Sequence, residues 1–205
     1  FALAGIAGTL SKLAFDACLF NSQNFGFVKL PDNCTTGSSI MPHKKNPDVF
    51  ELTRAKCNKI QALPQQIILI MNNLPCGYFR DLQIIKEVFL PAFEELKDCL
   101  RMTAYIINKI QVNEHILDDT KYDNIFSVEE VNRLATEGMP FRDAYKKVGL
   151  DIEAGRFTPH KAIHHTHEGS IGNLCNDRIR ALMEQIWNEF KFSKIHEAEN
   201  RLLGK

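Results

Sequence analysis

Residues 37–48 bring together side chains that could do chemistry. Their sequence, GSSIMPHKKNPD, contains adjacent hydroxyls, ammonium groups and an amide. Gly37 permits backbone conformations that other residues avoid, so the chain can pass close to a ligand there. Asn46 and Pro47 predict a helix start, with Asn46 as the N-cap and Pro47 as the first helical residue. Exposed N–H groups at that helix end, beside the lysine pair, favour an anion.

A second group of polar side chains lies in residues 78–86. Gln83 and Lys86 are three residues apart, so they share one face near the start of a predicted helix. Tyr78 lies just before that helix. A phenol, an amide and an ammonium group can together bind a polar ligand that carries a carboxylate. Taken alone, the spacing fits a solvated first helical turn better.

The segments that must position these groups have the apolar spacing of long helices. Apolar residues recur every three or four positions in residues 2–22, 48–73 and 81–110. Pro64 and Pro91 predict kinks in the second and third of these helices. Long helices joined by short turns predict a helical bundle.

Shorter elements follow the long helices. Ser127 with Glu130 has the capping-box spacing and predicts a helix that Gly138 stops. Further helices are predicted from Pro140 to about Gly155, from Thr158-Pro159, and over residues 177–190; no strand is predicted. The predicted fold is all-α, with part of a long-helix bundle in residues 1–111 and a small C-terminal helical domain in residues 112–205.

Composition argues against several classes of protein. The 25 basic and 25 acidic residues give a formal net charge of zero, so no overall field attracts nucleic acid or a membrane. No apolar run reaches the ~18 residues of a membrane span. The 6 cysteines form no Cys-x-x-Cys pair, which favours a reducing cytoplasmic location. The chain opens at Phe1, already in helical phase, and we expect it to be part of a longer polypeptide.

Histidines cluster near the C-terminal end. His160 and His164 are spaced by one helical turn, as in some zinc sites, and His165 and His167 follow. No cysteine or paired carboxylate completes a ligand set. A solvated turn is therefore the preferred interpretation, and no metal site is predicted.

Residues 32–47 resemble the signature loop of the fumarase/aspartase superfamily, because G-S-S-x-M-P-x-K-x-N-P matches at every fixed position. Within that superfamily, residues 44–48 (KKNPD) and residues 78–86 (Y-x-x-D-L-Q-x-x-K) are similar to the argininosuccinate lyase family. The likeness extends over nearly the whole chain and fades after about Phe190. Departures are His43, where Gln is usual, and Ile84-Ile85, where acidic residues are common.

The resemblance implies a β-elimination that cleaves argininosuccinate to arginine and fumarate, in arginine biosynthesis. It implies no cofactor, and a cytoplasmic homotetramer whose sites form where chains meet. Ser38 would be the base and Lys44 a catalytic cation. The residues expected to bind substrate are Ser39, Asn46, Tyr78, Gln83 and Lys86. The family's acid-side histidine and threonine motifs do not occur in these 205 residues, so we expect the isolated chain to be inactive.

Two alternatives remain open at this stage. Another lyase of the superfamily, of the adenylosuccinate lyase or aspartase type, would share the loop, but Tyr78, Gln83 and Lys86 argue against it. A non-catalytic structural protein like a lens crystallin would share the fold, but the intact Ser38, Lys44 and Asn46 argue against that.

Overall fold

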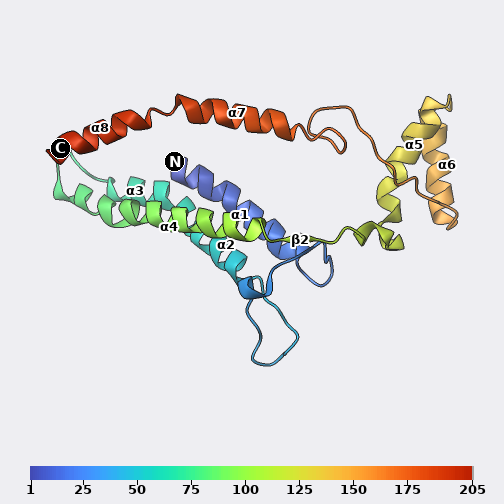
Figure 1. Cartoon of the computed structure of the whole chain (residues 1–205), viewed down its shortest axis with the longest axis horizontal. Coiled ribbons are helices and arrows are strands. Elements are labelled where there is room, and N and C mark those ends of the chain that lie inside the picture. Colours follow the sequence, from blue (N-terminus) through green and yellow to red (C-terminus); the bar gives the residue numbers. More distant parts are fainter. Residues whose placement is uncertain (205) are drawn as a thin grey trace. The chain divides into compact units, whose positions relative to one another are not determined.

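The computed structural model describes residues 1–204, and it is predominantly helical (Figure 1). This confirms the predicted all-α class. The chain forms two compact units, Phe1–Asp118 and a second that begins at Asp119. The predicted domain division at residues 111 and 112 stays a prediction.

The first unit contains helices α1 (Ala2–Phe20), α2 (Asp48–Gln61), α3 (Leu63–Ile70) and α4 (Ile85–Ile107). Helices α2 and α3 occupy the segment that was predicted as one kinked helix. Pro64 lies in the first turn of α3, where a missing N–H removes no helical hydrogen bond. Pro91 lies inside α4, as predicted.

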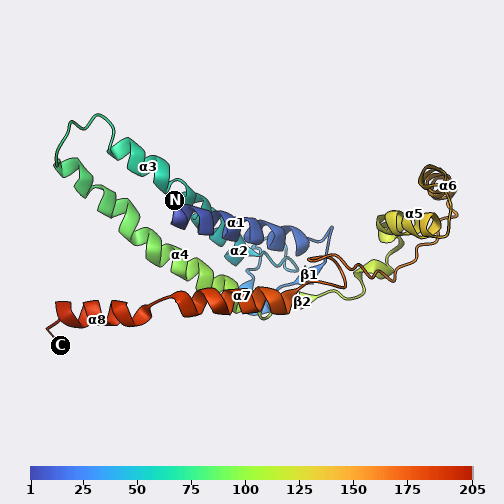
Figure 2. The same ribbon diagram turned by 90° about the horizontal axis from the view of Figure 1, so that it is seen from above.

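Helices α1, α2 and α4 pack lengthwise on one another (Figure 2). One buried cluster joins Ala7 of α1 to Ile60 of α2 and Leu96 of α4. A second cluster joins Ala14 of α1 to Phe50 of α2, and it also contains Ile106 of α4. Because early residues of α2 meet late residues of both neighbours, α2 runs antiparallel to α1 and to α4.

The first unit also contains a small sheet that the sequence did not predict. Strand β1 (Val28–Lys29) pairs antiparallel with β2 (Gln111–Val112). Each strand has only two residues, which is too short for an alternating apolar pattern. The pairing ties the segment after α1 to the segment after α4.

In the second unit a helix begins at Ser127 as predicted, but the capping role of Ser127 and the helix predicted at Thr158-Pro159 are wrong. Ser127 caps nothing, because a 3₁₀ helix, η4 (Thr120–Phe126), runs directly into α5 (Ser127–Thr136). The Asp119 carboxylate accepts from the backbone N–H of Lys121 at 3.0 Å and caps η4 instead. No helix forms at Thr158-Pro159, where the described backbone is extended or irregular.

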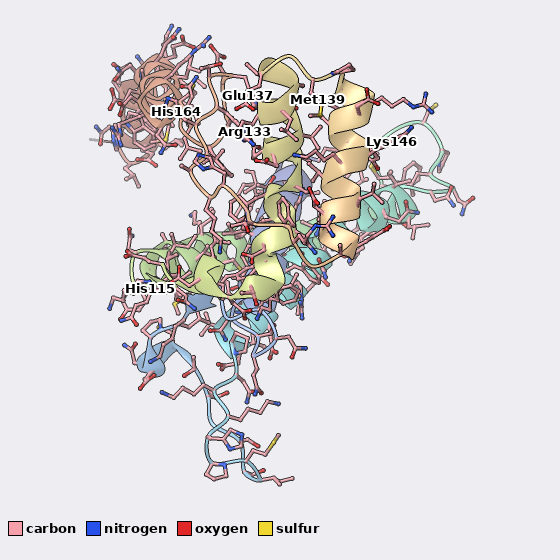
Figure 3. The ribbon with its side chains drawn as sticks, turned by 90° about the vertical axis from the view of Figure 1, so that its right-hand side faces the viewer. His115, Arg133, Glu137, Met139, Lys146 and His164 are labelled. Atoms are coloured by element: carbon pink, nitrogen blue, oxygen red, sulfur yellow. The ribbon has the colours of Figure 1, made fainter. Side chains whose placement is uncertain are left out.

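Helices α5 and α6 (Phe141–Glu153) lie side by side and share a core of Val131, Leu134, Ala144 and Val148 (Figure 3). Arg133 on α5 pairs with Glu130 and Glu137. Gly138 follows the end of α5 and has a φ of 102°, a conformation that favours glycine. Met139 is the next residue of the turn between α5 and α6. The exposed helices α7 (Asn176–Glu189) and α8 (Phe192–Leu202) follow; α8 was not predicted.

Among the described residues, α1 alone is long and apolar enough to cross a membrane by length and composition. Its small residues Ala7 and Ala14 have no exposed surface, because they pack on α2 and its neighbours. Only 17% of the apolar window is buried, so the finding concerns length and composition alone.

The core around Ile60 yields a stability prediction. Ile60 is 1% exposed, and Ile60→Ala should lower the free energy of unfolding by about 2–5 kcal/mol, because a cavity replaces packed methyl groups. Ile68→Ala is the matched control, since Ile68 is 54% exposed in α3 and should change stability by less than about 0.5 kcal/mol. Urea denaturation of the 205-residue chain measures both. An equal loss of unfolding free energy in Ile60→Ala and Ile68→Ala would show that Ile60 is not part of the stabilising core between α2 and α4.

Candidate active site

The segment between α1 and α2 carries the first group of candidate residues, and its tip projects beyond the helices (Figure 1). A backbone bridge closes the base of this loop. The N–H of Asn46 donates to the carbonyl of Thr36 at 2.8 Å, and the N–H of Thr36 donates to the carbonyl of Asn46 at 3.2 Å. The predicted N-cap role of Asn46 is therefore wrong: α2 starts at Asp48 after Pro47, with no side-chain cap. The Asn46 side chain donates to the carbonyl of Gly37 at 3.4 Å.

Ser38 is half-buried inside this loop. Its Oγ accepts hydrogen bonds from the backbone N–H groups of Ile40 at 3.3 Å and Met41 at 3.2 Å. Donors aimed at an oxygen favour the form that carries more negative charge. The loop therefore gives this hydroxyl the kind of surroundings that a serine base needs.

A pocket of about 620 Å³ lies beside the loop. One wall comes from the end of α1 and the turn after it, through Cys18, Asn21, Ser22 and Gln23. The other wall comes from the loop and the start of α2, through Met41, His43, Lys44, Lys45, Asn46, Pro47 and Glu51. The free N–H groups at the start of α2 add partial positive charge to this wall.

The two lysines of the pocket differ in their partners. Lys45 pairs with Asp32, and the hydrogen bond and charge of Lys45 hold the pKa of Asp32 below its ordinary value. The ammonium of Lys44 makes no ion pair within the described part of the chain, although its backbone N–H donates to Met41. Lys44 is thus the lysine that remains available to an anionic ligand.

The second candidate group is only partly assembled. The amide of Gln83 donates to the hydroxyl of Tyr78, so these two side chains are in contact. Gln83 ends a 3₁₀ helix, η2 (Arg80–Gln83), and Lys86 lies in the first turn of α4, so one continuous helix does not carry both. All three side chains are exposed.

The two candidate groups lie at opposite ends of the first unit. The second group stands at the start of α4, whereas the signature loop lies near its end, where Ile106 meets Phe50 of α2. At 1.5 Å per residue, the 23 residues of α4 separate these ends by about 35 Å. One chain therefore cannot bring Lys44 and Lys86 to the same small ligand.

Within the first group, Lys44 and Asn46 line the pocket, whereas Ser38 and Ser39 lie in the loop outside its lining. Sequence reasoning missed Glu51 and the wall at the end of α1. Glu51 follows Pro47 by one helical turn, so helical spacing offered a signal for it. The residues from Cys18 to Gln23 carried no such signal, because only the packing of α1 on α2 puts them there.

The four clustered histidines differ in their contacts and exposure. In the described residues, no group of three histidine, cysteine or acidic side chains is arranged to hold a metal ion. His165 instead pairs with Glu129 of α5 at 3.0 Å and stacks on His167, with ring centroids 5.4 Å apart. The prediction of a solvated turn holds for the exposed His160, His164 and His167, and it is wrong for the half-buried His165.

The sequence of this chain is similar to those of known lyases. A family model described as a lyase matches residues 1–62. The argininosuccinate lyases of Phocaeicola vulgatus and Bacteroides thetaiotaomicron are 79% and 80% identical to the chain over 205 residues. These matches cover 100% of this chain and 46% of each relative, so the chain spans about half the length of the curated relatives it matches. The argininosuccinate lyase of Ruthia magnifica is 34% identical over 181 residues, covering 88% of this chain and 36% of that protein.

Solved structures agree on the fold. A recombinant class II fumarase from Schistosoma mansoni has a TM-score of 0.64 at 23% identity, covering 75% of this chain and 32% of that chain. A fumarate lyase:delta crystallin from Brucella melitensis has a TM-score of 0.60 at 21% identity, covering 75% and 34%. At such identities the likeness concerns the helical fold alone.

The pairing of Lys45 with Asp32 leads to a prediction about loop mobility. Asp32→Asn should speed hydrogen exchange at the amides of Thr36 and Asn46 by up to about fivefold, because an exposed ion pair no longer holds the base of the loop. Since the folded pKa of Asp32 is depressed, the contact is present at neutral pH and is lost as pH falls through that pKa.

The control for this measurement is Asp98→Asn, which removes an exposed ion pair with Arg101 on α4. Exchange at the loop amides should not change in that variant. Equal exchange in wild type and Asp32→Asn would show that the Lys45–Asp32 pair does not restrain the loop.

Proposed function

This chain is a relative of the argininosuccinate lyases that spans about half of their length, and we propose that it forms part of an enzyme that cleaves argininosuccinate to arginine and fumarate. The observation that carries the proposal is the identity of 74–80% to argininosuccinate lyases over all or nearly all of the chain. The reaction is a β-elimination, which makes the enzyme a carbon–nitrogen lyase.

Proton removal is the step that the loop serves. The proton lost is bound to a carbon next to a carboxylate, so its removal places further negative charge on that carboxylate. Ser38 takes the proton, and its Oγ already accepts two backbone N–H bonds, which favour the deprotonated oxygen. The unpaired ammonium of Lys44 and the N-terminus of α2 stabilise the charge that develops.

Substrate binding uses the second group of residues. Tyr78, Gln83 and Lys86 bind the carboxylate and polar groups of argininosuccinate, together with Ser39 and Asn46 from the loop. Because the two groups lie at opposite ends of α4, each complete site draws them from different chains of a homotetramer. The elimination also needs an acid that protonates the departing guanidino nitrogen.

We expect the enzyme to lie in the cytoplasm. We expect its reaction to serve arginine biosynthesis. All 6 cysteines are free, which suits a reducing compartment. The ligands proposed for this chain are a small-molecule substrate and further copies of the same protein.

Two other functions remain as outcomes of a direct assay. The complete enzyme is incubated with argininosuccinate, adenylosuccinate or aspartate, and the unsaturated product is followed by its ultraviolet absorbance. Turnover of argininosuccinate alone supports the proposal. Turnover of another substrate would favour a different lyase of the superfamily, and a folded assembly that acts on none of them would favour a crystallin-like structural role.

Replacement of the proposed base gives a sharper test. Ser38→Ala in the complete enzyme should lower kcat by a factor on the order of 10²–10⁴ while substrate binding changes little, because proton removal belongs to the transition state. Ser193→Ala is the matched control, since Ser193 lies on the exposed helix α8. A kcat close to wild type in Ser38→Ala would rule out Ser38 as the base.

The second candidate group has its own test. Gln83→Ala and Lys86→Ala in the complete enzyme should each weaken argininosuccinate binding by about tenfold or more, because a hydrogen bond to a charged group is lost. Lys97→Ala removes another exposed lysine of α4, one that pairs with Glu94, and should leave binding unchanged. An unchanged Kd in both test variants would return residues 78–86 to the solvated-turn interpretation.

A further inference from the structure

His43 lies in the wall of the loop pocket, next to Lys44. It is exposed, and its ring makes no hydrogen bond or ion pair with any residue that the structure describes. The proposed reaction assigns roles to Ser38, Lys44 and Asn46 but leaves this ring without one. An unpaired imidazole at the mouth of an anion-binding pocket can donate two N–H groups when it is protonated.

The charged and titratable groups that share the pocket with His43 are few. Lys44 contributes one positive charge and Glu51 contributes one negative charge, and the charge of Lys45 is offset by its ion pair with Asp32, so these groups together carry no net charge. Burial raises the pKa of the Cys18 thiol, so that group stays neutral near pH 7. A protonated His43 changes this net charge from 0 to +1. It then lies beside Lys44 as a second cation that has no ion-pair partner among the described residues, so two cations are available to the two carboxylates of a four-carbon dicarboxylate such as fumarate.

We infer that His43 is a specificity-determining residue of this pocket, whose protonated ring binds a carboxylate of the fumarate unit and makes fumarate affinity depend on pH. This inference rests on the proposed function, since fumarate is the product of that reaction. Protonated His43 and the ammonium of Lys44 each bind one carboxylate. Neutral His43 keeps a single N–H donor and loses the charge.

The direction of the pH dependence follows from which groups titrate. Histidine is the side chain whose charge ordinarily changes between about pH 5 and 8, whereas lysine, glutamate and fumarate keep their charges from about pH 6 to 8. The charged ring binds the dianion better, so affinity should rise as pH falls through that range. Fumarate binding should then take up protons, because ligand and proton each favour the binding of the other. In the enzyme, higher pH would favour release of fumarate.

The test measures fumarate binding to the complete enzyme by titration calorimetry at about pH 6 and about pH 8. Wild-type Kd should be about fivefold lower at the acidic pH, the size expected for one exposed ion pair. His43→Gln should give weak binding at both pH values. His43→Lys, which carries a permanent charge, should give tight binding at both.

The matched control is His115→Gln, because His115 is 86% exposed at its side chain and is not among the residues that line the pocket. The Kd of the His115→Gln variant for fumarate should depend on pH as the wild-type Kd does. A pH-independent Kd in wild type, or an unchanged pH dependence in His43→Gln, would overturn the inference. Turnover of argininosuccinate by the wild-type enzyme is measured in parallel, so loss of the proposed function would be distinguished from failure of the histidine assignment alone.

Discussion

The antiparallel packing of α1 on α2 is the contact on which the pocket depends. Ala7 and Ala14 have no exposed surface, and a Cβ at Gly8 would stand 3.4 Å from the side-chain oxygen of Gln61. Small residues along α1 therefore let the two helices approach closely. This contact brings the end of α1 beside the start of α2, and those two ends are the walls of the pocket. The loop between them can carry reactive groups because the helices fix both of its ends.

The length of α4 keeps the second group of residues, Tyr78, Gln83 and Lys86, away from the pocket. A rigid helix of 23 residues keeps Lys86 about 35 Å from the end of the unit that holds Lys44. No adjustment of loops within the first unit removes that separation. If both groups act on one substrate, then another copy of the chain must supply one of them, and assembly becomes a condition for chemistry.

Prediction from sequence succeeded for the elements that have a regular residue pattern. Apolar spacing located the long helices, and Pro64 marked the break between α2 and α3. It failed where tertiary pairing overrode local preference: Asn46 has the residue type of an N-cap, yet its backbone pairs with Thr36 across the loop. The two-residue strands also depend on a contact between distant segments. The candidate residues of the loop were proposed from their types and spacing and stay a prediction, whereas Cys18 lines the pocket only through the packing of α1.

Within the loop, some side chains are held by other parts of the same chain, and neighbouring side chains are left available to a ligand. Lys45 is held by Asp32, and Ser38 is held by N–H groups of its own loop, so both arrangements form without any other chain. Among the residues that the structure describes, the Lys44 ammonium and the His43 ring have no such partners, and both residues line the pocket. A base whose surroundings are local can be positioned before substrate arrives, whereas unpaired cations gain most of their interaction energy from the ligand. In the proposed reaction, the activation of Ser38 and the binding of the fumarate unit by Lys44 and His43 are therefore properties of this chain, whereas the contribution of residues 78–86 is a property of the assembly.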